Sequence, residues 1–301
     1  MLHYLNIVNK GIVFIILSGL CFIVVNFFVK LLGAGEGQEL VDNLQRYPAH
    51  ELVLARSVVS FSISLFIIKR RKLSVFGNNK TWLLLRGISG TIALTIFFYT
   101  IHHLPLAVAS TIQYLSPIFT VVLAIFFLKE HVKLIQWLFI LLSFSGVALI
   151  SFSNLFIEQG EHLSLFWIGM GMLSAVFSGI AYTSIMKLRE TDAPITIVMY
   201  FPMVAIPFMV IMCFWEFTTP QGIEWLFLLL IGIFTQLAQI LLTKALHEGS
   251  ASLIMPFQYL GAIYAFLIGF FLFDEKLSLI IDVGIVLVIL GVLSNAIIRN
   301  R

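Results

Sequence analysis

The chain has 301 residues, of which 60% are hydrophobic and 11% are charged. Soluble globular proteins carry about 45–50% apolar and about 25% charged residues, so this composition excludes a water-soluble fold. The 29 phenylalanines exclude disorder, because disordered chains are poor in aromatic residues. A formal net charge of +3 is too small to indicate a nucleic-acid partner. We therefore expect an integral membrane protein surrounded by a lipid bilayer.

Ten apolar runs follow one another along the chain, and each is long enough to cross about 30 Å of hydrocarbon, which takes about 20 helical residues. The first run is longer than the apolar core of a signal peptide and no small-residue cleavage site follows it, so we expect a retained helix. Short loops join the runs and leave no room for a soluble domain. The predicted fold is an all-α integral membrane protein with ten transmembrane helices. The expected spans are 11–32, 50–68, 82–101, 106–127, 134–153, 164–186, 195–214, 223–245, 251–273 and 279–298.

Lysine and arginine mark the cytoplasmic side of a membrane protein. If the N-terminus lies in the cytoplasm, most basic residues fall at inner helix ends or in inner loops, and Arg86 is one of them. Only Lys30, Arg46, Arg56 and Lys276 fall on the other side. An even number of spans returns the chain to its starting side. We therefore predict a multi-pass protein of the cytoplasmic (inner) membrane with both termini in the cytoplasm.

The two halves of the chain are similar in sequence. A shift of 145 residues superposes Gln113-Tyr114-Leu115 on Gln258-Tyr259-Leu260 and Glu130 on Glu275. Each half holds five expected spans. Because five is odd, the halves would cross the membrane in opposite directions, and such inverted repeats are typical of secondary transporters. The alternative is a duplication without alternating access. The predicted repeats cover residues 1–155 and 160–301.

Each half of the chain carries its own set of short motifs. They are Arg86-Gly87, His103-Leu104-Pro105-Leu106-Ala107, Tyr114-Leu115-Ser116-Pro117 and Leu128-Lys129-Glu130, then Ala251-Ser252, Pro256-Phe257-Gln258-Tyr259 and Phe273-Asp274-Glu275. Together they resemble the EamA-type proteins of the drug/metabolite transporter superfamily over nearly the whole chain. The resemblance implies that spans 1–4 and 6–9 line a central cavity while spans 5 and 10 lie outside. It also implies a carrier, since similar proteins are described as transporters of S-adenosylmethionine, riboflavin or organic anions.

Polar residues deep in the expected spans indicate where cargo would bind. An unpaired polar group in hydrocarbon costs about 2–7 kcal/mol, so such groups should face protein or water. Spans 4 and 9 each carry a glutamine followed by a tyrosine and close to a proline, which weakens the helix. We predict cargo binding by these glutamines, with hydrogen bonding between packed helices as the alternative. The residues are Gln113, Tyr114 and Pro117 in the first half and Pro256, Gln258 and Tyr259 in the second.

Spans 3 and 8 carry matching polar stripes. The first stripe includes Tyr99 and His102, and the second includes Gln239 and His247. A polar stripe through an apolar helix needs a polar partner, so we expect both helices to line the transport pathway. The histidines lie at helix ends. We interpret them as solvated interface residues, with proton-linked gating as the alternative.

Arg56 lies about 9 Å inside the outer end of span 2, at 1.5 Å per residue. Its guanidinium keeps its charge, so it must pair, reach the interface or meet an anion. Contact with cargo would favour a carboxylate or phosphate. Asn26 in span 1 and Tyr182 in span 6 complete the predicted binding residues. No carboxylate falls at mid-span, which disfavours export of lipophilic cations by exchange against protons at a buried acid.

The sequence shows no phosphate-binding loop, nucleophile elbow or paired catalytic carboxylates, and Cys21 and Cys213 form no metal or disulfide pattern. We expect no cofactor, no metal and no enzymatic activity. The leading prediction is a secondary transporter that moves a small polar metabolite of the amino-acid, nucleoside-like, vitamin or carboxylate class by alternating access. We also expect transport to be coupled to a proton or another ion. The protein is expected to be a monomer or a weak homodimer. The alternative is a membrane-embedded enzyme or scaffold without transport activity.

Overall fold

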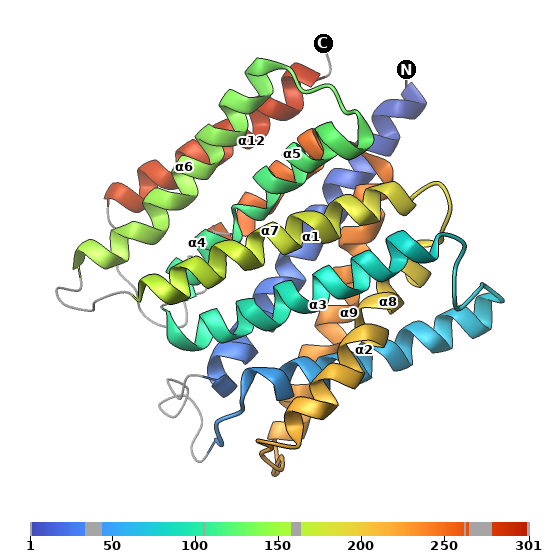
Figure 1. Ribbon diagram of the computed structural model, residues 1–301. Coiled ribbons are helices and arrows are strands. Elements are labelled where there is room, and N and C mark those ends of the chain that lie inside the picture. The colour runs from blue at the N-terminus through green and yellow to red at the C-terminus, as the bar shows by residue number, and fades with distance from the viewer. Residues whose placement is uncertain are drawn as a thin grey trace.

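The computed structural model describes residues 2–33, 44–104, 106–157, 164–261, 263–264 and 279–299. Within these ranges every regular element is a helix (Figure 1), which confirms the predicted all-α fold. The elements are α1 (Leu2–Gly33), α2 (Ala49–Arg71), α3 (Lys80–His103), α4 (Leu106–Gln113), α5 (Ser116–Leu128), α6 (Leu134–Ile157), α7 (Leu165–Leu188), α8 (Pro194–Cys213), α9 (Glu224–Glu248), α10 (Ala251–Ile254), the 3-10 helix η2 (Met255–Tyr259) and α12 (Leu279–Arg299).

Seven helical segments among the described residues are long and apolar enough to cross a membrane. They correspond to α1, α2, α3, α7, α8, α9 and the stretch Ala109–Leu128, while α6 and α12 contain the shorter apolar segments Leu134–Leu149 and Val283–Asn295. The expected span at 251–273 is described only as far as residue 264, so its second half lies outside the described residues, as do Glu275 and Lys276. Each of the ten predicted spans contains helical residues.

The expected span at 106–127 is two helices instead of one. Helix α4 ends at Gln113 and α5 begins at Ser116, with Tyr114 and Leu115 in a turn. Pro117 lies in the first turn of α5, and it has no N–H to donate to the carbonyl of Gln113, four residues earlier. The uninterrupted helix therefore stops at Gln113, about a third of the way along the expected span.

The equivalent span of the second half is also interrupted. The four-residue α10 passes into η2 at Met255, and Pro256 lies in the first turn of η2. The carbonyl that Pro256 leaves without a helical partner belongs to Ser252, and it accepts a hydrogen bond of 2.7 Å from the Asn295 side chain on α12. A neighbouring helix thus satisfies the broken backbone, as a membrane interior requires.

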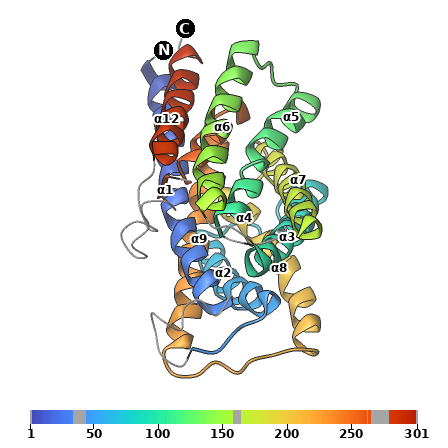
Figure 2. The same cartoon turned by 90° about the vertical axis from the view of Figure 1, so that its left-hand side faces the viewer.

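The helices pair across the two halves of the chain. Helix α1 packs along α9, α3 along α7, α2 along α8, and α6 along α12. Figure 2 shows the last pair beside the remaining helices, with the two chain ends at the same end of the bundle. An even number of spans requires this placement of the ends. Which membrane face they occupy stays a prediction.

Glycines allow the close approach of α6 and α12. A Cβ at Gly146 would lie 2.6 Å from the carbonyl oxygen of Gly284, and one at Gly291 would lie 2.8 Å from that of Phe139. No real side chain tolerates such distances, so both residues bring backbone against backbone, a common mode of packing between membrane helices. The shift that relates the halves superposes Gly146 on Gly291.

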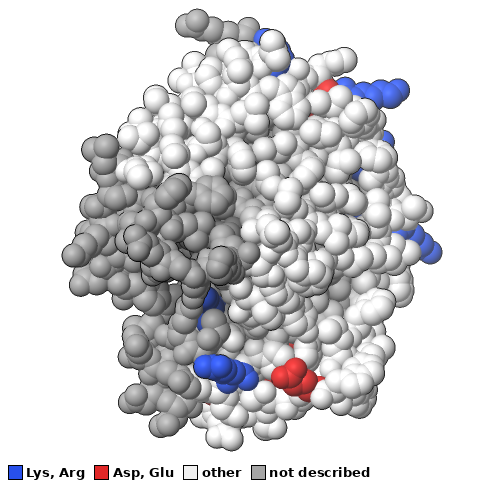
Figure 3. Space-filling view, turned by 60° about the vertical axis from the view of Figure 1, so that its left-hand side comes forward, with Lys and Arg blue, Asp and Glu red and all other residues white. Residues whose placement is uncertain are grey.

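The outer surface of the bundle is largely apolar. Large side chains such as Phe66, Phe126 and Leu138 are more than half exposed. Figure 3 shows one face on which uncharged surface separates charged side chains near its upper right margin from others near its bottom. An extended apolar surface between charged ends is what a lipid bilayer covers.

Candidate functional site

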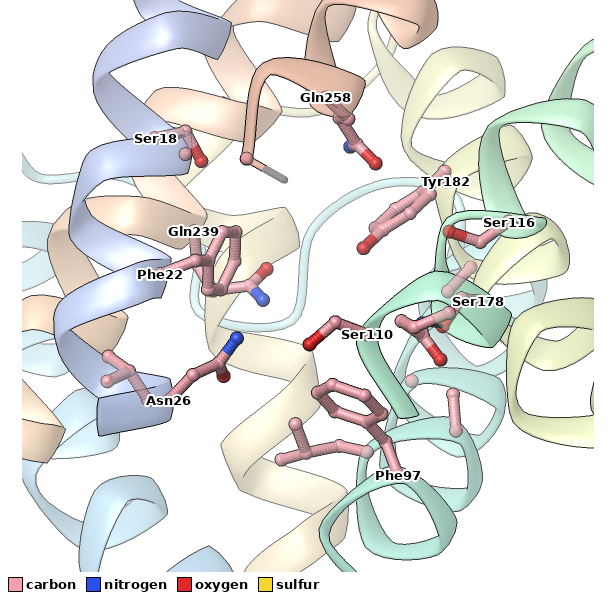
Figure 4. Close-up of a pocket in the computed structure, with 18 of the residues that line it drawn as sticks. Ser18, Phe22, Asn26, Phe97, Ser110, Ser116, Ser178, Tyr182, Gln239 and Gln258 are labelled. Atoms are coloured by element: carbon pink, nitrogen blue, oxygen red, sulfur yellow. Dashed lines mark hydrogen bonds between the residues drawn. The ribbon is translucent and has the colours of Figure 1, made fainter. Parts of the chain in front are cut away.

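A cavity of about 150 Å³ lies inside the bundle, between helices of both halves. Figure 4 shows Asn26 and Gln239 on one side of it, facing Ser110 and Tyr182 on the other. The described lining includes no residue of α6 or α12, in agreement with the outer position that the resemblance implied for spans 5 and 10. The polar and charged residues that line it are Ser18, Asn26, Arg56, Arg86, Ser110, Gln113, Tyr114, Ser116, Ser178, Tyr182, Gln239 and Gln258.

Seven of the predicted binding residues line this cavity, and two do not. Tyr99 contacts His50 instead, with its hydroxyl 3.0 Å from the ring Nδ1. Tyr259 is completely buried and packs edge to face against Tyr114, with 6.2 Å between the ring centroids. The residues that line the cavity are Asn26, Arg56, Gln113, Tyr114, Tyr182, Gln239 and Gln258.

The two histidines lie away from the described lining. His102 packs against Gly33 at the end of α1. In both His102 and His247 the ring Nε2 is buried and makes no hydrogen bond within the described part of the chain. These two Nε2 atoms are therefore not solvated, in contrast to the sequence-based interpretation of the histidines as solvated interface residues. Pro117 and Pro256 lie at the two helix breaks described above.

The two equivalent glutamines differ in what they contact. The Gln113 amide donates to Ser178 Oγ at 2.8 Å, and its Oε1 accepts from Ser174 Oγ at 3.0 Å. Both serines belong to α7, so Gln113 joins α4 to α7. Gln258 lines the cavity and makes no hydrogen bond to any described residue. Helix packing thus accounts for Gln113, while the Gln258 amide is available to a ligand.

Arg56 is part of the cavity wall. Only 1% of its surface is exposed, so it does not reach the membrane interface, the alternative that the sequence had left open. Its Nε and Nη2 atoms are buried without a hydrogen-bond partner in the described structure. The guanidinium lies over two aromatic rings, with Cζ 5.6 Å from the Phe98 centroid and 5.4 Å from that of Phe201.

Arg86 is the charged lining residue that the sequence interpretation missed, along with the smaller Ser18, Ser110, Ser116 and Ser178. The positive-inside rule explains Arg86 as a charge at the inner end of span 3, but the residue is 2% exposed and lines the same cavity as Arg56. Its Nη2 donates to Gln239 Oε1 at 2.8 Å, and its Cζ lies 5.9 Å from the Phe201 ring centroid. The sequence does carry a signal for this role, because Arg86 lies about one turn inside its expected span.

The cavity therefore combines two buried guanidinium groups with no carboxylate among its described lining residues. Arginine does not lose its proton in proteins, so both groups carry a charge. Among the described residues, the Gln239 amide and the faces of Phe98 and Phe201 contact these two guanidinium groups, and none of these contacts is with a carboxylate. The local field is positive.

A polar cluster joins the halves at the start of α2, and we call it the α2-start cluster. The Glu224 carboxylate accepts hydrogen bonds from Tyr47 Oη at 2.6 Å and from the backbone N–H of Gln45 and Gln221, both at 2.7 Å. Glu51 accepts from the Thr218 N–H at 2.9 Å. Burial and the hydrogen bond to Glu224 raise the pKa of Tyr47 above its usual value. The cluster fastens the segment before α2 to the start of α9.

A second polar cluster, the α2-end cluster, lies past the other end of α2. The Asp192 carboxylate accepts from the N–H groups of Asn78 and Asn79 at 2.5 and 3.2 Å. Tyr200 donates to the Phe76 carbonyl at 2.7 Å. The shift of 145 residues superposes Tyr47 on Asp192 and Asn79 on Glu224. Positions that the shift of 145 residues relates therefore join the two halves of the chain at both ends of α2.

An apolar helical bundle that encloses a polar cavity between its two halves is the architecture of a multi-pass membrane transporter. The family comparison agrees. The EamA-like transporter family model matches residues 9–152 and again residues 165–297. The chain belongs to the EamA-like transporter family, as its motifs had indicated.

Several relatives are named as transporters. The chain is 28% identical over 270 residues to the pseudopaline exporter CntI of Pseudomonas aeruginosa, covering 86% of each chain. It is 24% identical to a riboflavin transporter of Vibrio cholerae, covering 76% of this chain and 78% of the relative. A protein of known crystal structure has the same fold, with a TM-score of 0.78 over 97% of this chain and 98% of that protein's chain. The two sequences are 15% identical, so the likeness concerns the fold alone.

Proposed function

We propose that the protein carries a small polar organic metabolite across the cytoplasmic membrane by alternating access, with the cavity as its cargo site. The observation that carries this proposal is a cavity walled by both halves, in which polar side chains have no partner in the described structure. Asn26, Tyr182 and Gln258 line the cavity without a hydrogen bond to a described residue. The three side chains are half-buried at the cavity wall, and their polar groups are available to cargo.

The pairing of helices supports the alternating-access part of the proposal. Span 1 packs against span 8 and span 6 against span 3, as α1 with α9 and α7 with α3. This exchange of partners is what two inverted five-helix repeats, 1–155 and 160–301, would produce. In this mechanism the α2-start and α2-end clusters alternate, one breaking while the other holds. Cargo would then enter from one side and leave on the other.

The cargo belongs to the amino-acid, nucleoside-like, vitamin or carboxylate class. The cavity of about 150 Å³ is smaller than the roughly 300–1,000 Å³ of pockets for drug-sized ligands. Cargo as large as the riboflavin named for the Vibrio relative would require the helices to move apart. We include a coupling proton or ion, a monomer or weak homodimer, and both termini in the cytoplasm in the same proposal.

The test begins with a thermal-stability screen of the purified protein against amino acids, nucleosides, vitamins and carboxylates, because a ligand that binds only the folded state raises its stability. The most stabilising compound is then used, radiolabelled, for flux into proteoliposomes. We expect Gln258→Ala and Asn26→Ala to reduce uptake about tenfold or more. Ser145→Ala is the control, since this exposed serine of α6 bonds only its own helix.

Two results would contradict the proposal. Unchanged uptake in both cavity variants would remove the cavity as the cargo site. Product formation from a stabilising compound by the purified protein, without flux, would favour the membrane-embedded enzyme instead.

A further inference from the structure

We infer that the cavity is an anion site, and that cargo is held by a carboxylate or phosphate group between Arg56 and Arg86. This inference rests on the proposed function and names the chemical class of its cargo. The inference is based on the guanidinium groups of Arg56 and Arg86. They are the groups in the cavity wall that are most costly to bury, and no carboxylate among the described lining residues neutralises them.

Arg56 and Arg86 are both buried inside the bundle. They are 1% and 2% exposed. An ionised group inside a membrane protein is stable only when it is paired or solvated in a cavity. Within the described structure Arg56 makes no hydrogen bond, and Arg86 makes one, to a neutral amide. Neither guanidinium group therefore has a counter-ion in the described structure. An anionic ligand in the cavity would supply one.

The free atoms of Arg56 have the geometry that an oxyanion prefers. Nε and Nη2 are its two buried donors without a partner. They lie on the same edge of the planar guanidinium, and this edge can donate two parallel hydrogen bonds to one carboxylate or phosphate once the side chains that bury these two atoms move aside. Arg86 keeps a free Nε for the same ligand.

Arg86 is held in place before any ligand arrives. Gln239 fixes its Nη2, and Phe201 lies beneath its guanidinium and that of Arg56. One turn along α3, Gly90 provides the space, because a Cβ at Gly90 would collide with Arg86 Nη1. A site whose donors are fixed in advance loses less conformational entropy on binding.

The rest of the lining defines the remainder of the ligand. Asn26, Tyr182 and Gln258 offer neutral hydrogen-bonding groups, and Phe22 and Phe97 offer apolar surface. The matching cargo is an organic anion with a compact polar or ring-shaped body. A lipophilic cation would meet two like charges here and no acid among the described lining residues.

The experiment compares matched charged and neutral probes on the full-length protein in nanodiscs. Succinate is paired with succinamide, and glycerol 3-phosphate with glycerol, so the arms distinguish a carboxylate from a phosphate ligand. Binding is measured by thermal shift and calorimetry at constant ionic strength. We expect at least one anion to bind at least tenfold more tightly than its neutral partner, and Arg56→Lys and Arg86→Lys to reduce that difference. Arg46→Lys, an exposed residue before α2, is the control.

Several outcomes would overturn the inference. They are equal binding of the charged and neutral probes, no binding of either anion, or unchanged anion binding in both lysine variants. The comparison on the wild-type protein decides the question even if a variant fails to fold. The failures are also distinguishable, because saturable flux of neutral metabolites alone would reject the anion site and keep the transporter. No flux of any compound would reject the proposed function itself.

Discussion

Arg86 donates a hydrogen bond of 2.8 Å to Gln239, 153 positions further along the chain. The contact joins α3 of the first half to α9 of the second at the cavity wall. It links a charge to a neutral acceptor, and both side chains are buried. Any movement of the halves that separates α3 from α9 must break it, so the bond couples the position of a cavity-lining cation to the conformation of the bundle.

We expect Gln239→Leu to lower the free energy of unfolding by about 1.5–3 kcal/mol, because hydrogen bonds to charged groups have that strength and the Arg86 donor is left buried. Thermal unfolding in detergent, checked by calorimetry, measures the change. Gln221→Leu is the matched control, since its side chain is exposed outside the cavity, and it should change stability by less than about 0.5 kcal/mol. Equal effects of the two variants would contradict the assignment.

Gly90→Ala tests the space around Arg86. The added methyl group would collide with Arg86 Nη1 and come within 3.1 Å of Phe201. We expect a loss of stability of about 1–3 kcal/mol, as for overpacked cores, and weaker binding of anionic probes. Gly169→Ala on α7 is the control, because apart from its chain neighbours and the backbone of its own helix no described atom lies within 4 Å of a Cβ at that position. There the better helix propensity of alanine should stabilise the protein by up to about 1 kcal/mol.

The all-α membrane fold follows from the sequence because lipid leaves the backbone little choice but helices, and apolar runs of sufficient length are easy to recognise. The cost of burying polar groups directs attention to Asn26, Tyr182 and Gln258, and the structure places all three in the cavity lining. The same rule cannot tell that Gln113 bonds to a neighbouring helix while the Gln258 amide stays without a partner in the described structure. Their difference depends on Ser174 and Ser178 of α7, and helix packing alone brings those serines into reach.

Arg86 shows a second limit of sequence reasoning. A basic residue near the inner end of a span satisfies the positive-inside rule, and that explanation conceals any other role. Its burial depends on the neighbouring residues Gln239 and Phe201, which come from α9 and α8. Helix breaks were partly predictable from Pro117 and Pro256. The partner that satisfies the second break, Asn295, is specified only by the tertiary fold.

A double-mutant cycle tests that partner. We expect Asn295→Ala to destabilise the protein by about 1–3 kcal/mol, because it leaves the Ser252 carbonyl buried and unpaired. In a Pro256→Ala background the restored N–H can bond to that carbonyl, so the same substitution should cost less. A coupling energy of about 0.5–3 kcal/mol between the two sites is expected. Additive effects would show that the proline does not free this carbonyl.

The two polar clusters make a prediction about access to the cavity. In a variant with Cys21 and Cys213 replaced by serine, Ser110→Cys places a single thiol in the cavity wall. Glu224→Gln removes the charge that accepts from Tyr47, Gln45 and Gln221 at the α2-start cluster. Asp192→Asn does the same for Asn78 and Asn79 at the α2-end cluster.

Because charge-assisted hydrogen bonds are about twice as strong as neutral ones, each substitution should weaken its own cluster and favour opening at that end of α2. Labelling of the single introduced thiol by a membrane-impermeant maleimide, in right-side-out and inside-out vesicles, should therefore increase from opposite sides in the two variants. Arg46→Gln serves as the control, because this side chain is exposed and belongs to neither carboxylate's set of donors. An increase from the same side in both variants would contradict the assignment of the clusters to opposite gates. A combined variant that labels from both sides would show that each cluster closes its own end independently.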